Sequence, residues 1–235
     1  MASKPSRRSI GAVRSPAAHQ SILTAAEEIL NESGYGGFTI EAVARRAGAS
    51  KPTIYRWWKG KAALIMEIYE RERETALTVS DRGSLERELT IRMRNLWRLW
   101  QTTPLGHALR SILAEAQIDA AALAQLREEF LPKRRASTRA LFARAIARGE
   151  ISADADIEAA NTLIYSFNWF HLLTHQLDDE EAIDRYVRLI VDGLKHDNRR
   201  KKASEKKSAV TMPAAKPRRR ASRRTSRRAT TKGAR

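Results

Sequence analysis

A chain of 235 residues is long enough for one large domain or two small ones, and its lack of cysteine excludes disulfides, thiolate metal sites and cysteine nucleophiles. No apolar run follows the basic N-terminus before Ser21, and no stretch approaches the ~20 apolar residues that a bilayer-crossing helix needs. Together with the absence of cysteine, this predicts a soluble, cytoplasmic protein that has no membrane partner.

The net charge of +17 lies almost entirely at the two ends of the chain. Residues 198–235 hold sixteen Lys and Arg against the single acid Glu205, a net charge of +15, and residues 1–19 add +4. The body between them carries −2 and is therefore near neutral. Both ends are rich in Ser, Ala and Pro and poor in apolar residues, so we expect disordered tails over 1–18 and 198–235.

Basic tails on a soluble protein most often meet a polyanion, usually nucleic acid, because arginine-rich segments attract phosphate in any sequence context. Pro213 and Pro217 should keep the C-terminal tail extended and prevent one continuous basic helix. The alternative is charge that only keeps the protein soluble.

The body begins with short helical segments whose apolar residues recur every three or four positions. They cover residues 20–33, 39–47, 50–58 and 61 into the seventies. The first segment is stopped by a glycine cluster that begins at Gly34. Thr39 and Ser50 are good N-cap residues for the second and third, and Pro52 is tolerated in a first helical turn.

The rest of the body predicts longer helices and no strand, because no run of residues alternates cleanly in the way of a half-buried strand. The helices are expected at about 84–101, 104–117, 120–131, 133–149, 156–176 and 179–196. The breaks between them are expected at Pro104, Pro132, Gly149 and Asp178–Asp179. The fold class is therefore predicted to be all-α.

The second and third short helices, joined by a tight turn at Gly48, have the spacing of a helix-turn-helix. Such a unit lays its second helix in the major groove of DNA, where side chains near its N-terminus meet base edges. In that helix Lys51, Thr53 and Arg56 offer hydrogen-bond donors, and Tyr55 offers a hydroxyl to phosphate.

Residues 20–69 read I-L-x-A-A-x-E-I-L, then G-Y-x-G-F-T-I-E-A-V-A-R-R-A-G-A-S-K-P-T-I-Y-R-W-W-K-G-K-A-A-L-I, and resemble the DNA-binding domain of the TetR family of regulators. The resemblance implies phosphate contacts for Thr39, Tyr55 and Lys61, and a phosphate or base contact for Thr53. Together with the donors of the third helix, the predicted DNA-binding set is Thr39, Ser50, Lys51, Thr53, Tyr55, Arg56, Trp57 and Lys61. The alternative is a half-buried aromatic residue for Tyr55 and a solvated face for Lys51 and Arg56.

One pair of residues departs from the family pattern. The family often has His-Phe where this chain has Trp57-Trp58. Trp58 can replace the core phenylalanine by packing. Trp57 can donate one hydrogen bond from its indole but cannot carry the charge of the histidine.

The resemblance also implies a helix-turn-helix domain over 19–70 and a helical effector-binding and dimerisation domain over 71–197. Seven aromatic side chains are candidates for the effector pocket, with ordinary core packing as the alternative for each: Trp97, Trp100, His107, Phe130, Phe142, Trp169 and His175. The dimer is expected to form through the last two predicted helices, 156–176 and 179–196. The candidate interface residues are Ile164, His171, Tyr186, Val187, Ile190 and Leu194.

No catalytic constellation, cofactor motif or metal site is predicted. His171 and His175 are spaced to share one helix face, but Leu172 stands where a metalloprotease helix carries Glu, and no third ligand follows at a telling spacing. Nucleophile elbows, phosphate-binding glycine loops and dinucleotide fingerprints are also missing.

The sequence therefore predicts a ligand-responsive transcriptional regulator and not an enzyme. We expect a repressor that binds a palindromic operator in double-stranded DNA as a homodimer and is released by an unidentified small-molecule effector. One alternative is an architectural, nucleoid-type DNA-binding protein dominated by its Arg-rich tail. Another is an enzyme that acts on an apolar small molecule.

Overall fold

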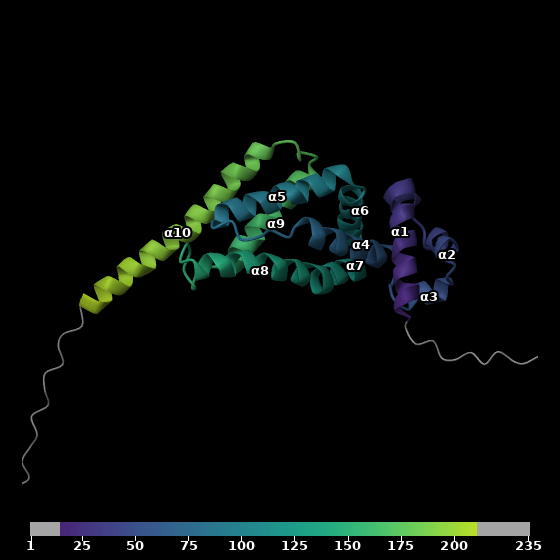
Figure 1. Cartoon of the computed structure of the whole chain (residues 1–235), viewed down its shortest axis with the longest axis horizontal. Helices are drawn as coiled ribbons and strands as arrows, with labels where there is room; N and C mark the ends of the chain where they lie inside the picture. Colours follow the sequence, from purple (N-terminus) through teal and green to yellow (C-terminus); the bar gives the residue numbers. More distant parts are fainter. Residues whose placement is uncertain (1–14, 211–235) are drawn as a thin grey trace, which may run out of the picture. The chain divides into compact units, whose positions relative to one another are not determined.

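The structure is a computed structural model that describes residues 15–210, with side chains over 15–134 and 136–195 (Figure 1). Every regular element in this part of the chain is helical, which confirms the predicted all-α fold. The helices are α1 (Pro16–Gly37), α2 (Ile40–Ala47), α3 (Lys51–Tyr55), α4 (Lys61–Ala76), α5 (Leu85–Thr102), α6 (Leu105–Ile118), α7 (Ala120–Gln125), η1 (Leu126–Phe130), α8 (Leu131–Ala147), α9 (Ile157–Leu173) and α10 (Glu180–Val210).

The chain forms two compact units, residues 1–198 and 199–235, and the described side chains all belong to the first. None of the helices in the described part is long and apolar enough to cross a membrane.

Helix α1 begins earlier than the predicted residue 20 because Ser15 caps it. The Ser15 hydroxyl oxygen accepts a hydrogen bond from the backbone N–H of Ala18 at 3.4 Å, and Pro16 fits the first turn. The helical path is interrupted at Gly34, whose φ of 62° and ψ of −172° are open only to glycine. The expected N-terminal tail, 1–18, therefore overlaps the start of α1, and residues 1–14 lie outside the described range.

Helices α2 and α3 form the predicted helix-turn-helix, each with its predicted cap. The Thr39 side chain accepts from the N–H of Ala42 at 3.1 Å, and the Ser50 side chain accepts from the N–H of Thr53 at 3.3 Å. Gly48 closes the turn between them in the left-handed region, with φ 61° and ψ 26°. These two caps and the turn fix the direction in which α3 leaves α2.

Helix α4 connects the three N-terminal helices to the larger helical body (Figure 1). On the N-terminal side, Leu64 is fully buried together with Val43 and Ile54 of the helix-turn-helix. On the body side, the Tyr69 hydroxyl oxygen accepts a hydrogen bond from Trp100 Nε1 of α5 at 2.9 Å. Helix α4 contributes side chains to the core of the N-terminal helices and to the core of the larger body. A displacement of α4 therefore moves α3 relative to that body.

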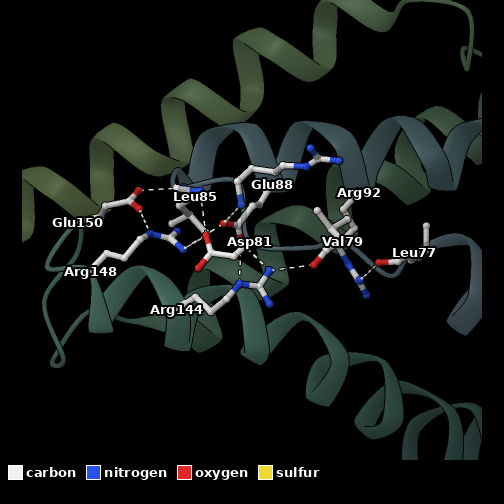
Figure 2. A network of polar contacts seen from close by, with 11 residues as sticks. Leu77, Val79, Asp81, Leu85, Glu88, Arg92, Arg144, Arg148 and Glu150 are labelled. Atoms are coloured by element: carbon white, nitrogen blue, oxygen red, sulfur yellow. Dashed lines mark hydrogen bonds and ion pairs between the residues drawn. The ribbon is translucent and has the colours of Figure 1, made fainter.

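An ion network centred on Glu88 of α5 holds the segment between α4 and α5 against the end of α8 (Figure 2). The Glu88 carboxylate is fully buried and accepts hydrogen bonds from Arg144 Nη2 at 2.6 Å and Nε at 3.1 Å, while Arg148 Nη1 lies 3.1 Å from it. Arg144 also donates to the carbonyl of Val79 at 3.2 Å, and Arg148 to Asp81 at 2.8 Å. One buried carboxylate thus fixes the connecting segment to two helices.

The predicted break at Pro132 is wrong, because the helical path runs on from α7 through η1 into α8. Proline cannot donate to the carbonyl four residues earlier, and its ring clashes with that carbonyl in a regular α-helix. The wider turn of η1 relieves both problems, and the N–H of Leu131 bonds to the carbonyl of Leu126, five residues back. The result is one long helical wall instead of two separate helices.

Helix α10 continues to Val210, beyond its predicted end at 196, so part of the expected disordered tail is helical. The extension consists largely of Lys, Arg, Glu and Ala, which are good helix formers even without a packed face. The rest of the predicted tail, with Pro213 and Pro217, lies outside the described residues.

Candidate functional site

Helix α3 and its C-cap expose three of the eight predicted DNA-binding side chains. Lys51, Tyr55 and Arg56 are exposed, while Ile54 between them is fully buried in the core. Tyr55 is a large aromatic residue with 52% of its surface exposed. From this exposed position the Tyr55 hydroxyl can donate a hydrogen bond to a phosphate oxygen.

Two caps lie on the same surface and keep hydrogen atoms available to a partner. The Thr39 hydroxyl uses its oxygen as the acceptor for α2 and can still donate its hydrogen. Thr53 is half-buried, and its hydroxyl oxygen lies 2.8 Å from that of Ser50. The Thr39 hydroxyl, and whichever of the Ser50 and Thr53 hydroxyls accepts the bond between them, can therefore donate to phosphate without loss of the caps.

Lys51 forms an ion pair with Glu41 of α2, which the sequence analysis did not identify. The hydrogen bond from Lys51 lowers the pKa of the Glu41 carboxyl below its usual value. Both side chains are about half exposed, so the pair contributes little to stability. A DNA phosphate or base edge can replace Glu41 as the partner of Lys51 at little cost.

The start of α4 is a second cationic position. Gly60 precedes α4 and supplies no side-chain cap, so the first N–H groups of this helix have no capping side chain as a partner. The positive end of the helix dipole therefore lies at Lys61, the first residue of α4. The Lys61 ammonium lies 3.8 Å from the ring centroid of Tyr35. The Tyr35 hydroxyl in turn donates to Glu115 of α6 at 2.6 Å. Burial, reinforced by this hydrogen bond, raises the pKa of Tyr35.

Trp57 and Trp58 turn away from the exposed face of α3 and pack around His19 of α1. The ring centroid of His19 lies 4.5 Å from that of Trp57 and 4.8 Å from that of Trp58. Trp58 Nε1 also donates to Glu67 of α4 at 2.6 Å. Trp58 therefore takes the predicted core role, and Trp57 is half-buried at the inner side of the DNA-binding helices.

A cavity of about 940 Å³ lies on this inner side, between the end of α3, α4, α5, α6 and the long α7–α8 wall. Its apolar lining includes Trp57, Trp58, Met66, Ile112, Leu126 and Phe130. Its charged lining includes Glu67, Glu70, Arg73, Arg92, Lys133 and Arg144. A cavity that combines apolar walls with charged groups can bind a small molecule that carries both kinds of group, and this one is lined by Trp57 and Trp58 directly after α3.

The seven aromatic residues predicted for the effector pocket do not form one site. Phe130 lines the large cavity, and Trp100 and Trp169 line a smaller chamber of about 30 Å³ next to it. Trp97 and Phe142 are buried in the core and line neither space, and His107 and His175 are exposed on the surface. Aromatic residue type alone did not indicate the charged residues of α4, α5 and α8 that line the cavity.

The residues predicted for the dimer interface mostly face the protein's own core. Val187 is fully buried, and Ile164, His171, Ile190 and Leu194 are all less than a tenth exposed within one protomer. Tyr186 is half-buried and donates its hydroxyl hydrogen to the carbonyl of Leu163 at 2.6 Å. The exposed large apolar residues of the same two helices are Leu163, Phe170, Leu173 and Leu189. Leu163 and Phe170 are seven residues apart, a spacing that marks one helix face and could have been read from the sequence.

The two neighbouring histidines do not come together. His171 lies inside α9, where its Nδ1 is 2.8 Å from the carbonyl oxygen of Phe167. His175 follows the end of the helix with a φ of 60° and is exposed. Within the described part of the chain, no three His, Asp or Glu side chains gather in a way that could hold a metal ion.

Comparison with known proteins matches both halves of the described chain. Residues 22–68 match the family described as bacterial regulatory proteins, tetR family, and residues 79–190 match the tetracyclin repressor-like C-terminal domain. The HTH-type transcriptional regulator YdeS of Bacillus subtilis is 33% identical over 181 residues, which cover 77% of this chain and 89% of YdeS.

Two further relatives agree in sequence and in fold. The DNA-binding transcriptional repressor TetR of Mycobacteroides abscessus is 29% identical over 71% of this chain and 87% of its own length. The crystal structure of the TetR family transcription regulator SCO0332 superimposes with a TM-score of 0.67 at 28% identity, covering 75% of this chain and 97% of that one. With its helix-turn-helix, its helical body and these matches, the chain belongs to the TetR family and is a transcriptional regulator, not an enzyme.

Proposed function

We propose that this regulator is a repressor that binds an inverted-repeat operator as a homodimer and releases it when a small molecule occupies the large cavity. The observation that carries the proposal is the position of Trp57 and Trp58, which follow α3 directly and also line the cavity. A small molecule that displaces either indole therefore acts on α3 through the residues that directly follow it. The protein would act in the cytoplasm, where its DNA lies.

DNA recognition is proposed to divide between two sets of side chains. Thr39 before α2, Tyr55 at the end of α3 and Lys61 at the start of α4 would hold the phosphate backbone, while Lys51 at the start of α3 and Arg56 just after it would reach base edges. Ser50 and Thr53 would orient the start of α3. Trp57 supplies the cavity wall rather than charge to the DNA.

The proposal is tested by selecting duplexes from a random library with the full chain and measuring their affinity across salt concentrations. A repressor should enrich an inverted repeat and keep a large ratio of operator to random-DNA affinity as salt rises. An architectural protein that binds through its basic tail should enrich no motif, and its ratio should stay near one. Enrichment of no motif would overturn the proposal.

Substitution of Lys61 by alanine is expected to weaken binding to all duplexes about equally and to reduce the salt slope by ~1 unit, because one phosphate contact is lost. Substitution of Arg56 by alanine should instead alter which operator bases matter, at ~1–3 kcal/mol if it makes a bidentate base contact. Affinities for the operator and for each single-base variant of it distinguish the two results. Altered base preference in the Lys61 variant with unchanged random-DNA binding would reverse these roles.

The proposed dimer uses the exposed apolar face of α9 and α10. Leu163, Phe170 and Leu173 of α9 and Leu189 of α10 are exposed in one protomer although they are large and apolar. Gly193 of α10 has open space around the position of its missing Cβ, so a second helix could approach closely there. Such a face is costly in water and is covered if the same face of a second copy packs on it.

The basic C-terminal segment is proposed to raise affinity without selecting the site. Once the body is bound, a tethered cationic segment meets neighbouring phosphates at high effective concentration. Truncation after Val210 removes ten Lys and Arg, and truncation after Asn198 removes sixteen. We expect operator preference to survive both changes, while affinity and salt slope fall in two steps, by ~0.9 per lost phosphate contact.

The two truncations are measured by fluorescence anisotropy at several salt concentrations, with sedimentation as the control for assembly. Truncation after Val210 keeps all of α10, so comparison of the two variants separates the effect of lost charge from the effect of lost helix. A salt slope that is unchanged in both variants would mean that the segment only solubilises the protein.

A further inference from the structure

A small chamber of about 30 Å³ lies directly beside the large cavity. The two spaces share Arg73, Leu77 and Arg92 as lining residues, so they adjoin at these side chains. The remaining wall of the chamber comes from α5, α8 and α9, and none of its described lining residues is acidic. The chamber is too small for a drug-sized molecule, but it can accommodate a single functional group of one.

Three buried hydrogen-bond donors in the chamber wall lack a partner. Arg134 Nη2, Tyr165 OH and Trp169 Nε1 are shielded from solvent and have no hydrogen-bond acceptor within the described part of the chain. All three side chains line the chamber. Because a buried polar group without a partner costs ~1–3 kcal/mol, three in one place indicate a missing acceptor.

The charges around the chamber are also unbalanced. Arg73 and Arg134 share the single carboxylate of Glu70, at 3.0 Å and 3.1 Å. Arg92 makes no ion pair among the described residues, and it donates instead to the carbonyl of Leu77 and the hydroxyl of Ser137, both at 2.7 Å. Burial, together with the neighbouring Arg73, lowers the pKa of Arg92 to about 10. Among the described residues, the guanidinium groups of Arg73, Arg92 and Arg134 thus have one paired carboxylate, that of Glu70.

A water molecule would fit the volume but would satisfy only part of this demand. It accepts about two hydrogen bonds and brings no charge. A carboxylate accepts about four, and its negative charge compensates Arg92 in a region where desolvation strengthens the pairing. The position of the chamber also leaves the rest of such a molecule beside the apolar wall formed by Met66, Leu126 and Phe130.

We infer that the effector is an amphipathic carboxylate, whose carboxylate group enters the chamber against Arg92, Arg134, Tyr165 and Trp169 and whose apolar body fills the large cavity. This inference rests on the proposed function, since it names the chemical class of the effector for that cavity.

The same arginine connects the chamber to α4. Arg92 donates to the carbonyl of Leu77, just after α4, and Asn95 of α5 donates to the carbonyl of Ala76, its last residue, at 3.1 Å. A carboxylate that draws Arg92 toward the chamber competes with the Leu77 carbonyl for its guanidinium. Binding of the anion therefore loosens the C-terminal end of the helix whose N-terminal end carries Lys61.

The test compares three probes with the same ten-carbon chain: decanoate, decanol and decyltrimethylammonium. Calorimetric titration of the DNA-free full chain should show decanoate binding at least ~10-fold more tightly than decanol, because charge-assisted hydrogen bonds form only with the anion. The cationic probe should bind more weakly than decanol. Equal affinity for decanoate and decanol would overturn the inference.

Variants locate the site of the anion. Arg92→Gln keeps a donor for Leu77 but removes the charge, and it should weaken decanoate ~10–100-fold and leave decanol unchanged. Tyr165→Phe removes one hydroxyl and should lower the affinity for decanoate ~10-fold. This second variant tests the anion site even if Arg92→Gln fails to fold. Arg139→Gln, in an exposed ion pair with Glu158 on the surface of α8, is the matched control and should change neither affinity.

Operator release distinguishes this inference from the proposed function. If the protein selects an inverted repeat but decanoate neither binds nor releases it, the anion site is refuted and the repressor remains. If no operator is selected, the repressor proposal fails, while calorimetry on the DNA-free protein still decides the anion site. Equal weakening of decanoate in Arg139→Gln and Arg92→Gln would refute a specific role for the chamber.

Discussion

Replacement of Glu88 by glutamine is expected to lower the free energy of unfolding by about 3–5 kcal/mol, a large fraction of what holds an average domain together. Glutamine has the same shape, so no cavity forms, but Arg144 loses its ion-pair partner among the described residues. Arg148 keeps Asp81 and Glu150, which limits the loss on that side. The substitution removes the negative charge from a fully buried group that pairs with two arginines. This is costly because the arginines remain charged in a place where water is scarce.

Urea denaturation followed by circular dichroism measures this effect. The matched control is Arg139→Gln, which breaks an exposed pair and should cost about 0–1 kcal/mol. High salt should reduce the small control effect and leave the Glu88 effect nearly intact, since buried pairs are poorly screened. A loss of unfolding free energy below about 1 kcal/mol in the Glu88→Gln protein would show that the network contributes little to fixing the segment between α4 and α5.

Replacement of Phe170 by glutamate is expected to raise the dissociation constant of the proposed dimer at least ~30-fold, as for a central interface residue. Phe170 has 56% of its surface exposed in one protomer, so the fold itself does not need its ring. In a dimer that buries the α9 and α10 face, the new carboxylate would lose its water without gaining a partner. Operator affinity should fall with it, because two half-sites are then bound independently.

Sedimentation velocity across a range of protein concentrations measures the dimer directly. Ile118→Glu is the matched control, because Ile118 is 90% exposed and belongs to the end of α6 rather than to α9 or α10. Ile190→Glu provides the opposite control, since Ile190 is buried in the protomer and its substitution should unfold the chain instead of releasing folded monomers. Folded Phe170→Glu protein that sediments like the wild type would place the dimer interface elsewhere.

The helix-turn-helix could be predicted closely because its signals are local. Thr39 and Ser50 cap helices within three residues of themselves, and Gly48 needs only its own backbone conformation. Such interactions are encoded in a few consecutive residues, so a single sequence is enough to place them. The sequence also predicted that Ile54 faces the core, and Ile54 is fully buried while Lys51 and Tyr55 of the same helix are exposed.

The cavity could not be predicted in the same way, because its wall is assembled from helices distant in the sequence. The guanidinium groups of Arg73 and Arg92 are brought to the same Ser137 hydroxyl by three different helices. In the sequence each arginine looks like part of a solvated face. Prediction therefore favoured aromatic residues, and two of the seven candidates, His107 and His175, are exposed.

The dimer residues show the limit of helical periodicity. Periodicity identified an apolar stripe on α10 correctly, and Val187, Ile190 and Leu194 do share one face. It cannot tell whether a stripe faces the core or a second chain, and Leu189 lies one residue outside the stripe that was chosen. The Pro132 error has a similar origin, because the wider turn that accommodates it depends on hydrogen bonds that no local rule indicates.

The double role of the Trp57–Trp58 pair has a consequence for the engineering of biosensors from this protein. Exchange of the DNA-binding domain, residues 22–68, is an obvious way to redirect a regulator to a new promoter. Here that exchange would also carry Trp57, Trp58 and Met66, and with them one wall of the cavity. If the proposed effector binds in this cavity, promoter choice and the response to small molecules cannot be exchanged independently of each other. A chimera would keep its original inducer profile only if the cavity-facing residues of the donor domain were restored to those of the recipient.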